Sequence, residues 1–150
     1  MFKKILVPTD GSALSEKSAK AAIQFAATND AKIVAVTVAH QISALALSDA
    51  AGAQMLEDYE ESQDQVSLSN ATKIQSLANK AGVRCEIVIS RAEHPYEEIL
   101  TIAKNKRCDV IWMASRSRSN LQKLLLGSET QRVLSHTAIP VLVWQKGSWD

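Results

Sequence analysis

Residues 32–39 (KIVAVTVA) constrain the fold most strongly, because they are rich in β-branched side chains and almost continuously apolar. A strand with one face in water alternates apolar and polar side chains, whereas a strand covered on both faces is apolar throughout. Such doubly covered strands are typical of parallel sheets with helices on each side. The segment therefore predicts a buried strand in an α/β protein.

Similar apolar runs alternate along the chain with stretches of helical periodicity. We predict strands at residues 5–7, 32–39, 83–90, 108–113 and 139–144. We predict helices at residues 15–27, about 53–81, 95–103 and about 129–135. Strands that alternate with helices imply right-handed crossovers, and hence one parallel sheet with helices on both faces. The chain has 150 residues, a length that suits a single domain whose core needs no disulfide or metal.

Glycine, proline and polar residues mark the ends of these elements. Pro8 ends the first strand, and the Asp10-Gly11 pair after it has turn chemistry. Gly82 is a helix C-terminus signal, and Pro95 suits the first turn of a helix. Residues 41–54 are not assigned, because Gly52 interrupts any helix there.

The long helix is predicted to bury one stripe of apolar side chains. The stripe runs through Met55, Tyr59, Ser62, Val66, Ile74, Leu77 and Ala78. The first half of the helix is also acidic, with Glu57, Asp58, Glu60, Glu61 and Asp64. We interpret this cluster as the solvated face of the helix. A metal site is the alternative, and the cluster contains no histidine and no convergent spacing.

Charge and composition argue against several classes of function. The net charge of +1 gives no overall field that would favour nucleic acid or an acidic membrane. Arg116, Arg118, Lys123 and Arg132 form a local basic patch, but no aromatic residues are interleaved with them. No apolar run approaches the roughly 20 residues that span a bilayer, and the N-terminus does not read as a signal peptide. We therefore expect a cytoplasmic protein with no nucleic-acid or membrane partner.

Cys85 and Cys108 lie far apart in the sequence, each at or beside an apolar run. We interpret them as buried, reduced cysteines, with a redox or metal role as the alternative. The three histidines, His40, His94 and His136, are scattered. We expect His40 to border the site, and His94 and His136 to be surface or cap residues.

The strongest candidate for a binding site is the stretch at residues 113–131 (MASRSRSNLQKLLLGSETQ). It leaves a predicted strand and enters a predicted helix, where free N–H groups and the helix dipole attract anions. Ser128 and Gln131 have the spacing of a capping box, and Gly127 permits a close backbone approach or a positive φ. Two interpretations remain open, an anion site and a simple capped helix. If the first and fourth strands are neighbours, the Asp10 and Ser115 loops face each other across a crevice at the switch point of the sheet.

Three parts of the chain together resemble the universal stress protein family. They are KKILVPTDGS at positions 3–12, VIWMASRSRS at positions 110–119, and LLLGSETQRVL with IPVLVW at positions 124–134 and 139–144. The resemblance covers nearly the whole chain. It implies a flavodoxin-like five-stranded parallel sheet, of the adenine nucleotide alpha hydrolase-like type, in the order 3-2-1-4-5. It also implies a homodimer in which the last strands meet, with Val141 and Val143 at the interface.

The resemblance further implies an adenine-nucleotide site. Asp10, with Pro8 and Thr9 beside it, matches the position that contacts the ribose, and Val38 matches a position beside the adenine. Ser128, Glu129 and Thr130 match the helix start that meets the phosphates, and Met113 leads into the phosphate loop. The implied ligand is ATP or another adenine nucleotide, with Mg²⁺ if it is bound.

The glycine motif of the nucleotide-binding members, G-x-x-G-x9-G-S, is only half retained. Its frame falls on Ala114, Ser117, Gly127 and Ser128, so the first two glycines are replaced. Glycine lets phosphate approach the backbone and adopts positive φ, a conformation that costs serine on the order of 1 kcal/mol. We expect Arg116 and Arg118, with charge-assisted hydrogen bonds, and the added serine hydroxyl to offset part of that loss. Asn120 and Ala92 also stand where relatives often have glycine.

Three functions are therefore considered. The first is a dimeric stress-response or signalling protein that binds an adenine nucleotide weakly or in an altered pose. The second is a homodimeric interaction protein that binds no nucleotide, as in the family branch with altered glycines. The third is a slow ATPase or self-phosphorylating protein, which is disfavoured because the sequence shows no activated nucleophile, Walker lysine or paired carboxylates. We expect no enzymatic activity.

Overall fold

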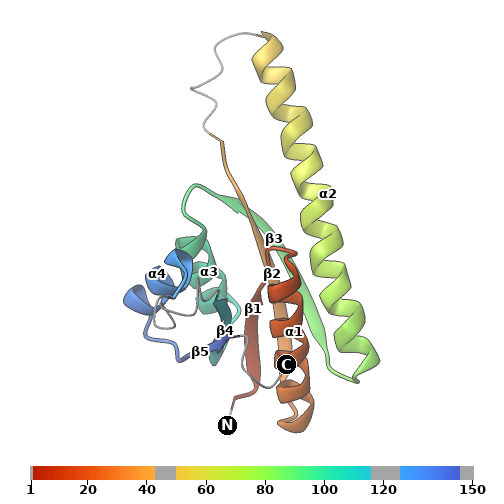
Figure 1. The fold of residues 1–150 in the computed structure, drawn as a ribbon, viewed down its shortest axis with the longest axis vertical. Coiled ribbons are helices and arrows are strands. Elements are labelled where there is room, and N and C mark those ends of the chain that lie inside the picture. Colours follow the sequence, from red (N-terminus) through yellow and green to blue (C-terminus); the bar gives the residue numbers. More distant parts are fainter. Residues whose placement is uncertain (1, 43–49, 116–125, 146–150) are drawn as a thin grey trace.

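The computed structural model describes residues 2–42, 50–115 and 126–145, which form a parallel sheet between two helical layers (Figure 1). The strands are β1 (Lys4–Pro8), β2 (Lys32–His40), β3 (Cys85–Ala92), β4 (Val110–Ser115) and β5 (Val141–Gln145). The helices are α1 (Ala13–Thr28), α2 (Ala50–Lys80), α3 (Pro95–Asn105) and α4 (Ser128–His136). The strand order is β3-β2-β1-β4-β5, which confirms the predicted order.

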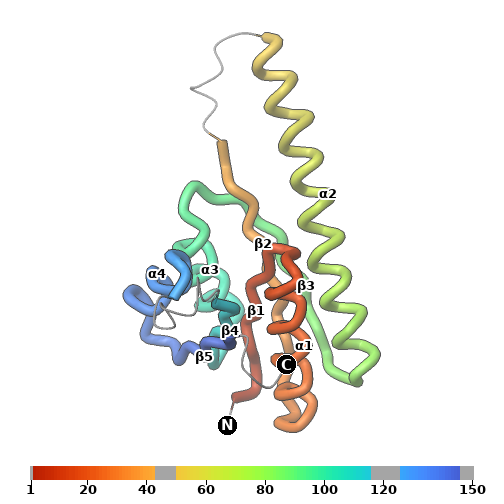
Figure 2. The backbone as a smooth tube through the Cα atoms, viewed as in Figure 1, coloured from red at the N-terminus to blue at the C-terminus, as the bar shows by residue number. Residues whose placement is uncertain are grey.

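β1 and β4 are neighbours at the centre of the sheet, where the strand order reverses (Figure 2). Ile5 pairs with Val110, and Leu6 pairs with Ile111. The carboxylate of Asp109 holds this register, because its Oδ2 accepts the backbone N–H groups of Lys3 and Lys4 at 2.7 and 2.8 Å. The loops that follow β1 and β4 consequently leave the sheet at adjacent points.

The core consists of two apolar layers, one on each face of the sheet. Alternate residues of the central strands enter opposite layers, as the period of two in a strand requires. Ile5 and Trp112 pack toward α1 and α2, whereas Leu6, Ile111 and Met113 pack on the face of α3. Trp112 also donates its indole N–H to Ser18 Oγ at 3.1 Å, so this large buried side chain has a polar partner.

Three helices end in the same way, and this explains where the next strands begin. Asp30, Gly82 and Arg107 each have a positive φ, of 51°, 73° and 53°. The next residue then donates its N–H to a carbonyl five positions back, as in the Schellman motif. These bonds join Ala31 to Ala26, Val83 to Ala78 and Cys108 to Ala103, at 2.9, 2.9 and 2.8 Å.

The predicted starts of β3 and β4, at residues 83 and 108, are therefore two residues too early. Val83 and Cys108 are apolar and buried, as strand residues would be. Their N–H groups, however, close the preceding helix and do not join the sheet ladder. The apolar pattern is the same in both roles, so it cannot separate them.

The prediction for the first half of α2 is wrong. Met55, Tyr59 and Val66 are 71%, 43% and 51% exposed, whereas the buried residues of α2 lie on a different face and mostly in its second half. The 31-residue helix is about 46 Å long, and the nine-residue strand β2 spans only about 30 Å. The start of α2 therefore extends past the sheet, as the yellow end of the helix shows in Figure 1.

Arg91, near the end of β3, links this projecting half of α2 to the body. Its guanidinium contacts Glu60 Oε2 and Asp64 Oδ2, each at 2.6 Å, and donates to the Glu60 carbonyl at 2.8 Å. Asp64 stays exposed while it pairs with Arg91, so the interpretation of the acidic cluster as a solvated face is wrong only for the partly buried Glu60. It holds for Glu57, Asp58 and Glu61, which are exposed. Within the described ranges, no three potential metal-ligating side chains form a group.

Replacement of Arg91 by alanine is expected to loosen the start of α2, because it removes two ion pairs and one helix-carbonyl bond. Hydrogen exchange of the amides at positions 54–64 should accelerate severalfold, while exchange in β1 and β4 stays unchanged. Lys20→Ala is the matched control, because it removes an exposed ion pair to Glu16 at 2.9 Å. Equal effects of the two variants on positions 54–64 would contradict the role assigned to Arg91.

Candidate functional site

A cavity of about 690 Å³ lies at the carboxyl ends of β1, β2 and β4. Ten of the twelve predicted site residues line it: Pro8, Thr9, Asp10, Val38, Met113, Ala114, Gly127, Ser128, Glu129 and Thr130. The other two, Arg116 and Ser117, lie outside the described residues, as do Arg118 and Asn120. The pairing of β1 with β4 brings the first and last thirds of the chain together at this cavity.

The loop between β1 and α1 is held by its own polar groups. The Thr9 N–H donates to the Val36 carbonyl at 2.8 Å, and the buried Thr9 hydroxyl is 3.1 Å from Ser15 Oγ. Asp10 Oδ1 accepts the Ser12 N–H at 2.9 Å, which is the Asx turn expected of this residue type. Ser12 then caps α1 by accepting the Ser15 N–H at 3.2 Å.

Gly11 is required in this loop for two reasons. Its φ is +76°, which favours glycine, and an added Cβ would lie 2.3 Å from the Asn70 side chain. Asn70 belongs to α2, so the loop is pressed between the sheet and that helix. This close approach fixes the loop where it enters the cavity.

On the opposite wall, the start of α4 is joined to the end of β4. The Gly127 N–H donates to the hydroxyl of Ser115, a 1% exposed residue, at 3.2 Å. Gly127 is the N-cap of α4, with φ −57° and ψ 151°, and its carbonyl accepts the Gln131 N–H at 3.0 Å. The first helical N–H groups, those of Ser128, Glu129 and Thr130, consequently point out of the helix beside the cavity.

The predicted capping box of Ser128 and Gln131 is wrong. Ser128 is the first helical residue, and no side chain caps α4. A capping box needs its serine one position earlier, with extended backbone, and that position is Gly127. Ser119 and Gln122 have the same spacing and would form a second, weaker capping box, but they lie outside the described residues.

Of the two reasons offered for Gly127, the positive φ is wrong, and the close approach of a ligand to the backbone stays a prediction. Its φ is negative, and an added Cβ would meet no atom of the described residues within 4 Å. The space beside this glycine belongs to the cavity that it lines. Local backbone geometry therefore does not demand glycine here, and the open space leaves room for a ligand against the backbone.

Glu129 puts a negative charge at the start of α4. Its Oε1 accepts a bond from Arg132 at 3.2 Å, whereas its Oε2 is buried and has no hydrogen-bond partner. The helix dipole stabilises a carboxylate at this end, and the same charge lowers the attraction of the helix start for anions. This wall therefore combines unpaired N–H groups with one acidic side chain.

The histidines do not form part of the site. His40 is exposed at the end of β2 and does not line the cavity, so the expectation that it borders the site is wrong. His94 and His136 are exposed at helix ends, as expected, and His136 Nδ1 lies 2.8 Å from the Arg132 carbonyl. Neither supplies a side-chain cap to α3 or α4.

Several lining residues were missed at the sequence level: Ser12, Leu14, Ser15, Val36, Pro95, Ile99, Leu126 and Gln131. Val36 was accessible from the sequence, since it lies two positions before Val38 and so on the same face of β2. Pro95 and Ile99 are four residues apart on α3, and only the packing of that helix brings them to the cavity. They add apolar surface to the wall that contains Val36 and Val38.

The comparisons with known proteins match this arrangement. Residues 1–145 match the profile of the Universal stress protein family. The chain belongs to the universal stress protein family. Its curated relatives include Universal stress protein MJ0531 of Methanocaldococcus jannaschii, which is 31% identical over 146 residues, 97% of this chain and 84% of the relative. Universal stress protein YxiE of Bacillus subtilis is 30% identical and is aligned over 95% of this chain and 99% of its own.

Solved structures of universal stress proteins show the same fold. The structure of the hypothetical protein MJ0577 superposes with a TM-score of 0.80 at 26% identity, over 99% of both chains. A universal stress protein in complex with cAMP has a TM-score of 0.69 at 19% identity, over 97% and 98% of the two chains. A family protein from Arabidopsis thaliana with AMP bound has a TM-score of 0.72 at 18% identity, over 97% and 93%. At 19% and 18% identity, the similarity to the last two structures supports a shared fold and nothing more.

The thiols of Cys85 and Cys108 are expected to react slowly with thiol reagents while the protein is folded. Burial raises the pKa of each thiol to about 11, so only about one thiol in a thousand is ionised at pH 8. Modification by Ellman's reagent should accelerate about tenfold per pH unit up to pH 10, while the protein unfolded in urea reacts at the rate of free cysteine. Rapid labelling of either thiol at pH 7 would contradict this and support the redox alternative.

Proposed function

We propose that this universal stress protein binds an adenine nucleotide, weakly or in an altered pose, as a dimeric stress-response or signalling module. The convergence of ten predicted residues on one cavity is the observation that carries the proposal. Two proteins of the same fold are described with cAMP and with AMP bound, which supports an adenine nucleotide as the ligand class. The remaining support comes from the chemistry of the two cavity walls.

One end of the cavity suits an adenosine. Val36, Val38 and Ile99 offer apolar surface for a flat base, and such surface with a few polar groups is typical of small-molecule sites. Asp10 lies at the rim of this surface, and its Oδ1 is oriented by the Ser12 N–H. A carboxylate there accepts hydrogen bonds from ribose hydroxyls.

The other end suits phosphate less well. The N–H groups of Ser128, Glu129 and Thr130 offer hydrogen bonds to an anion at a helix N-terminus. Ala114 replaces a motif glycine, and the Glu129 carboxylate repels phosphate. The unpartnered Oε2 of Glu129 is an oxygen of the type that Mg²⁺ prefers, so it would hold a metal that accompanies the phosphates. These features support weak or altered binding.

A homodimeric interaction protein that binds no nucleotide is the second candidate, and the alanine at position 114 favours it. Both candidates include a homodimer through β5, which is an edge strand of the sheet. Val141 and Val143 are only half-buried in the single chain. An exposed apolar edge strand is stabilised when another strand pairs with it.

We propose a binding role and not an enzymatic one. The Thr9 and Ser15 hydroxyls beside the cavity hydrogen-bond to each other, and among the described residues no histidine lines the cavity to activate them. A slow ATPase or a self-phosphorylating protein is therefore the weaker alternative. We also propose a cytoplasmic location, which two unpaired cysteines support. Within the described ranges, no helix has the length and apolarity needed to cross a membrane.

Titration calorimetry on nucleotide-stripped protein tests the main proposal. ATP, ADP or AMP should release heat and raise the melting temperature, because a ligand that binds only the folded state stabilises it. Ala114→Leu should abolish the heat by filling the cavity, whereas the surface variant Leu134→Ala should not change it. No heat and no stabilisation at millimolar nucleotide would leave the interaction protein as the function.

Restoring the two motif glycines is expected to improve phosphate binding. The double variant Ala114→Gly, Ser117→Gly should bind ATP about tenfold more tightly, since glycine lets phosphate approach the backbone and adopts positive φ without strain. Adenosine, which carries no phosphate, is the matched control ligand and should bind with unchanged affinity. An unchanged ATP affinity would count against the glycine argument.

Light scattering tests the proposed dimer. The native chain should have the mass of a dimer at micromolar concentration, and Val143→Lys should shift it to a monomer, because a lysine on an edge strand opposes strand pairing. Leu134→Ser, an exposed residue of α4, serves as the control and should remain dimeric. A native monomer at this concentration would refute the interface.

A further inference from the structure

The projecting half of α2, residues 50–66, carries an apolar stripe that no other described part of the chain packs against closely. Met55, Tyr59 and Val66 are 71%, 43% and 51% exposed. They are spaced by four and seven residues, which places them on one side of the helix. Single exposed apolar residues are ordinary on a protein surface, but a stripe with helical spacing is typical of a contact surface.

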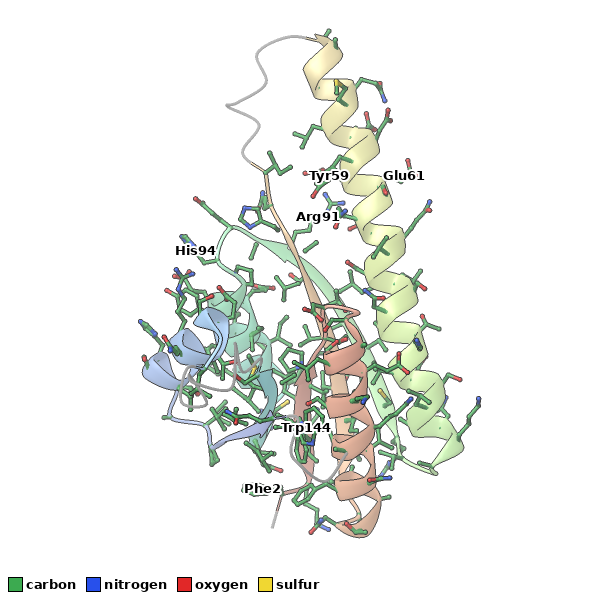
Figure 3. The ribbon with its side chains drawn as sticks, in the orientation of Figure 1. Phe2, Tyr59, Glu61, Arg91, His94 and Trp144 are labelled. Carbon is green, nitrogen blue, oxygen red and sulfur yellow. The ribbon has the colours of Figure 1, made fainter. Side chains whose placement is uncertain are left out.

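This stripe is not a continuation of the core. The buried positions of α2, among them Ser67, Ala71 and Ile74, lie on a neighbouring face that packs on the sheet. The first half of the helix is held instead by Arg91, through Glu60 and Asp64. Figure 3 shows Arg91 between the sheet and α2, with Glu61 on the side of the helix away from the sheet. The stripe is therefore presented on an anchored helix, which lowers the entropy cost of binding.

The charge beside the stripe indicates what binds there. Residues 50–66 contain five acidic residues and no basic one. Arg91 pairs with two of the acids, and Glu57, Asp58 and Glu61 remain exposed. Asp58 is three residues from Met55, so it flanks the stripe directly. A partner that covers the stripe consequently meets the Asp58 carboxylate along one edge, whereas Glu57 and Glu61 lie farther round the helix.

The exposed apolar stripe and the acidic residues near it favour one class of binding partner over the others. Two copies of this surface would bring like charges together, and anionic lipids or nucleic acid would be repelled. A helix with an apolar face and a flank of lysine or arginine satisfies both features, because it buries the stripe and pairs with Asp58 in the acidic surroundings of residues 50–66. We propose that residues 50–66 form a docking surface for a basic amphipathic helix of a partner protein.

A synthetic 18-residue peptide of leucine and lysine, with leucines at helical spacing, is the probe for this surface. The full chain should bind the labelled peptide in fluorescence anisotropy, with an affinity that falls as salt rises. Tyr59→Ser with Val66→Ser should weaken binding at least about tenfold, as removal of central apolar contacts does. Asp58→Asn should weaken it and flatten the salt dependence.

Leu68→Ser is the matched control, because Leu68 is 50% exposed on α2 but lies off the stripe. All the variants alter exposed residues, and circular dichroism verifies that they fold. The control should bind the peptide as the native chain does, and a leucine–glutamate peptide should not bind. Equal weakening by Leu68→Ser, or no peptide binding by the native chain, would overturn the proposal. Self-association that Tyr59→Ser abolishes would overturn it in favour of a second copy.

Discussion

The parallel pairing of β1 with β4 is the contact on which the rest of the structure depends. It joins strands that are about a hundred residues apart in the chain, and Asp109 secures it through the backbone of Lys3 and Lys4. Because the strand order reverses at this pair, the loops that follow β1 and β4 diverge and leave a crevice between them. The cavity, its apolar base and its polar rim follow from this one pairing.

The two halves of helix α2 have different structural roles. Its second half packs on the sheet through small and apolar side chains such as Ala71 and Ile74. Its first half extends past the sheet and is held by the ion pairs of Arg91. The same helix supplies Asn70, which presses against Gly11 at the edge of the cavity. Contact with a partner at the projecting half would therefore act on the helix that also supports the site.

Much of the fold and most of the candidate site were predictable from local signals. The apolar runs located the five strands, and a resemblance in three motifs indicated the strand order. The errors share one physical cause: the same sequence pattern occurs in two different structural environments. Val83 and Cys108 resemble strand residues but close helices. Ser128 and Gln131 have the spacing of a cap, yet Gly127 occupies the cap position.

The sequence by itself determined the alternation of strands and helices, because side-chain periodicity reflects burial on one face or on both. It also determined the chemistry after β1 and at the start of α4, including Asp10, Gly127 and Ser128. Tertiary structure alone decided that Ile99 of α3 lines the cavity, that Oε2 of Glu129 is buried without a partner, and that the stripe of Met55, Tyr59 and Val66 stays exposed. The reason is geometric: a sequence pattern specifies which face of a helix is apolar, but only packing specifies whether a surface lies against that face.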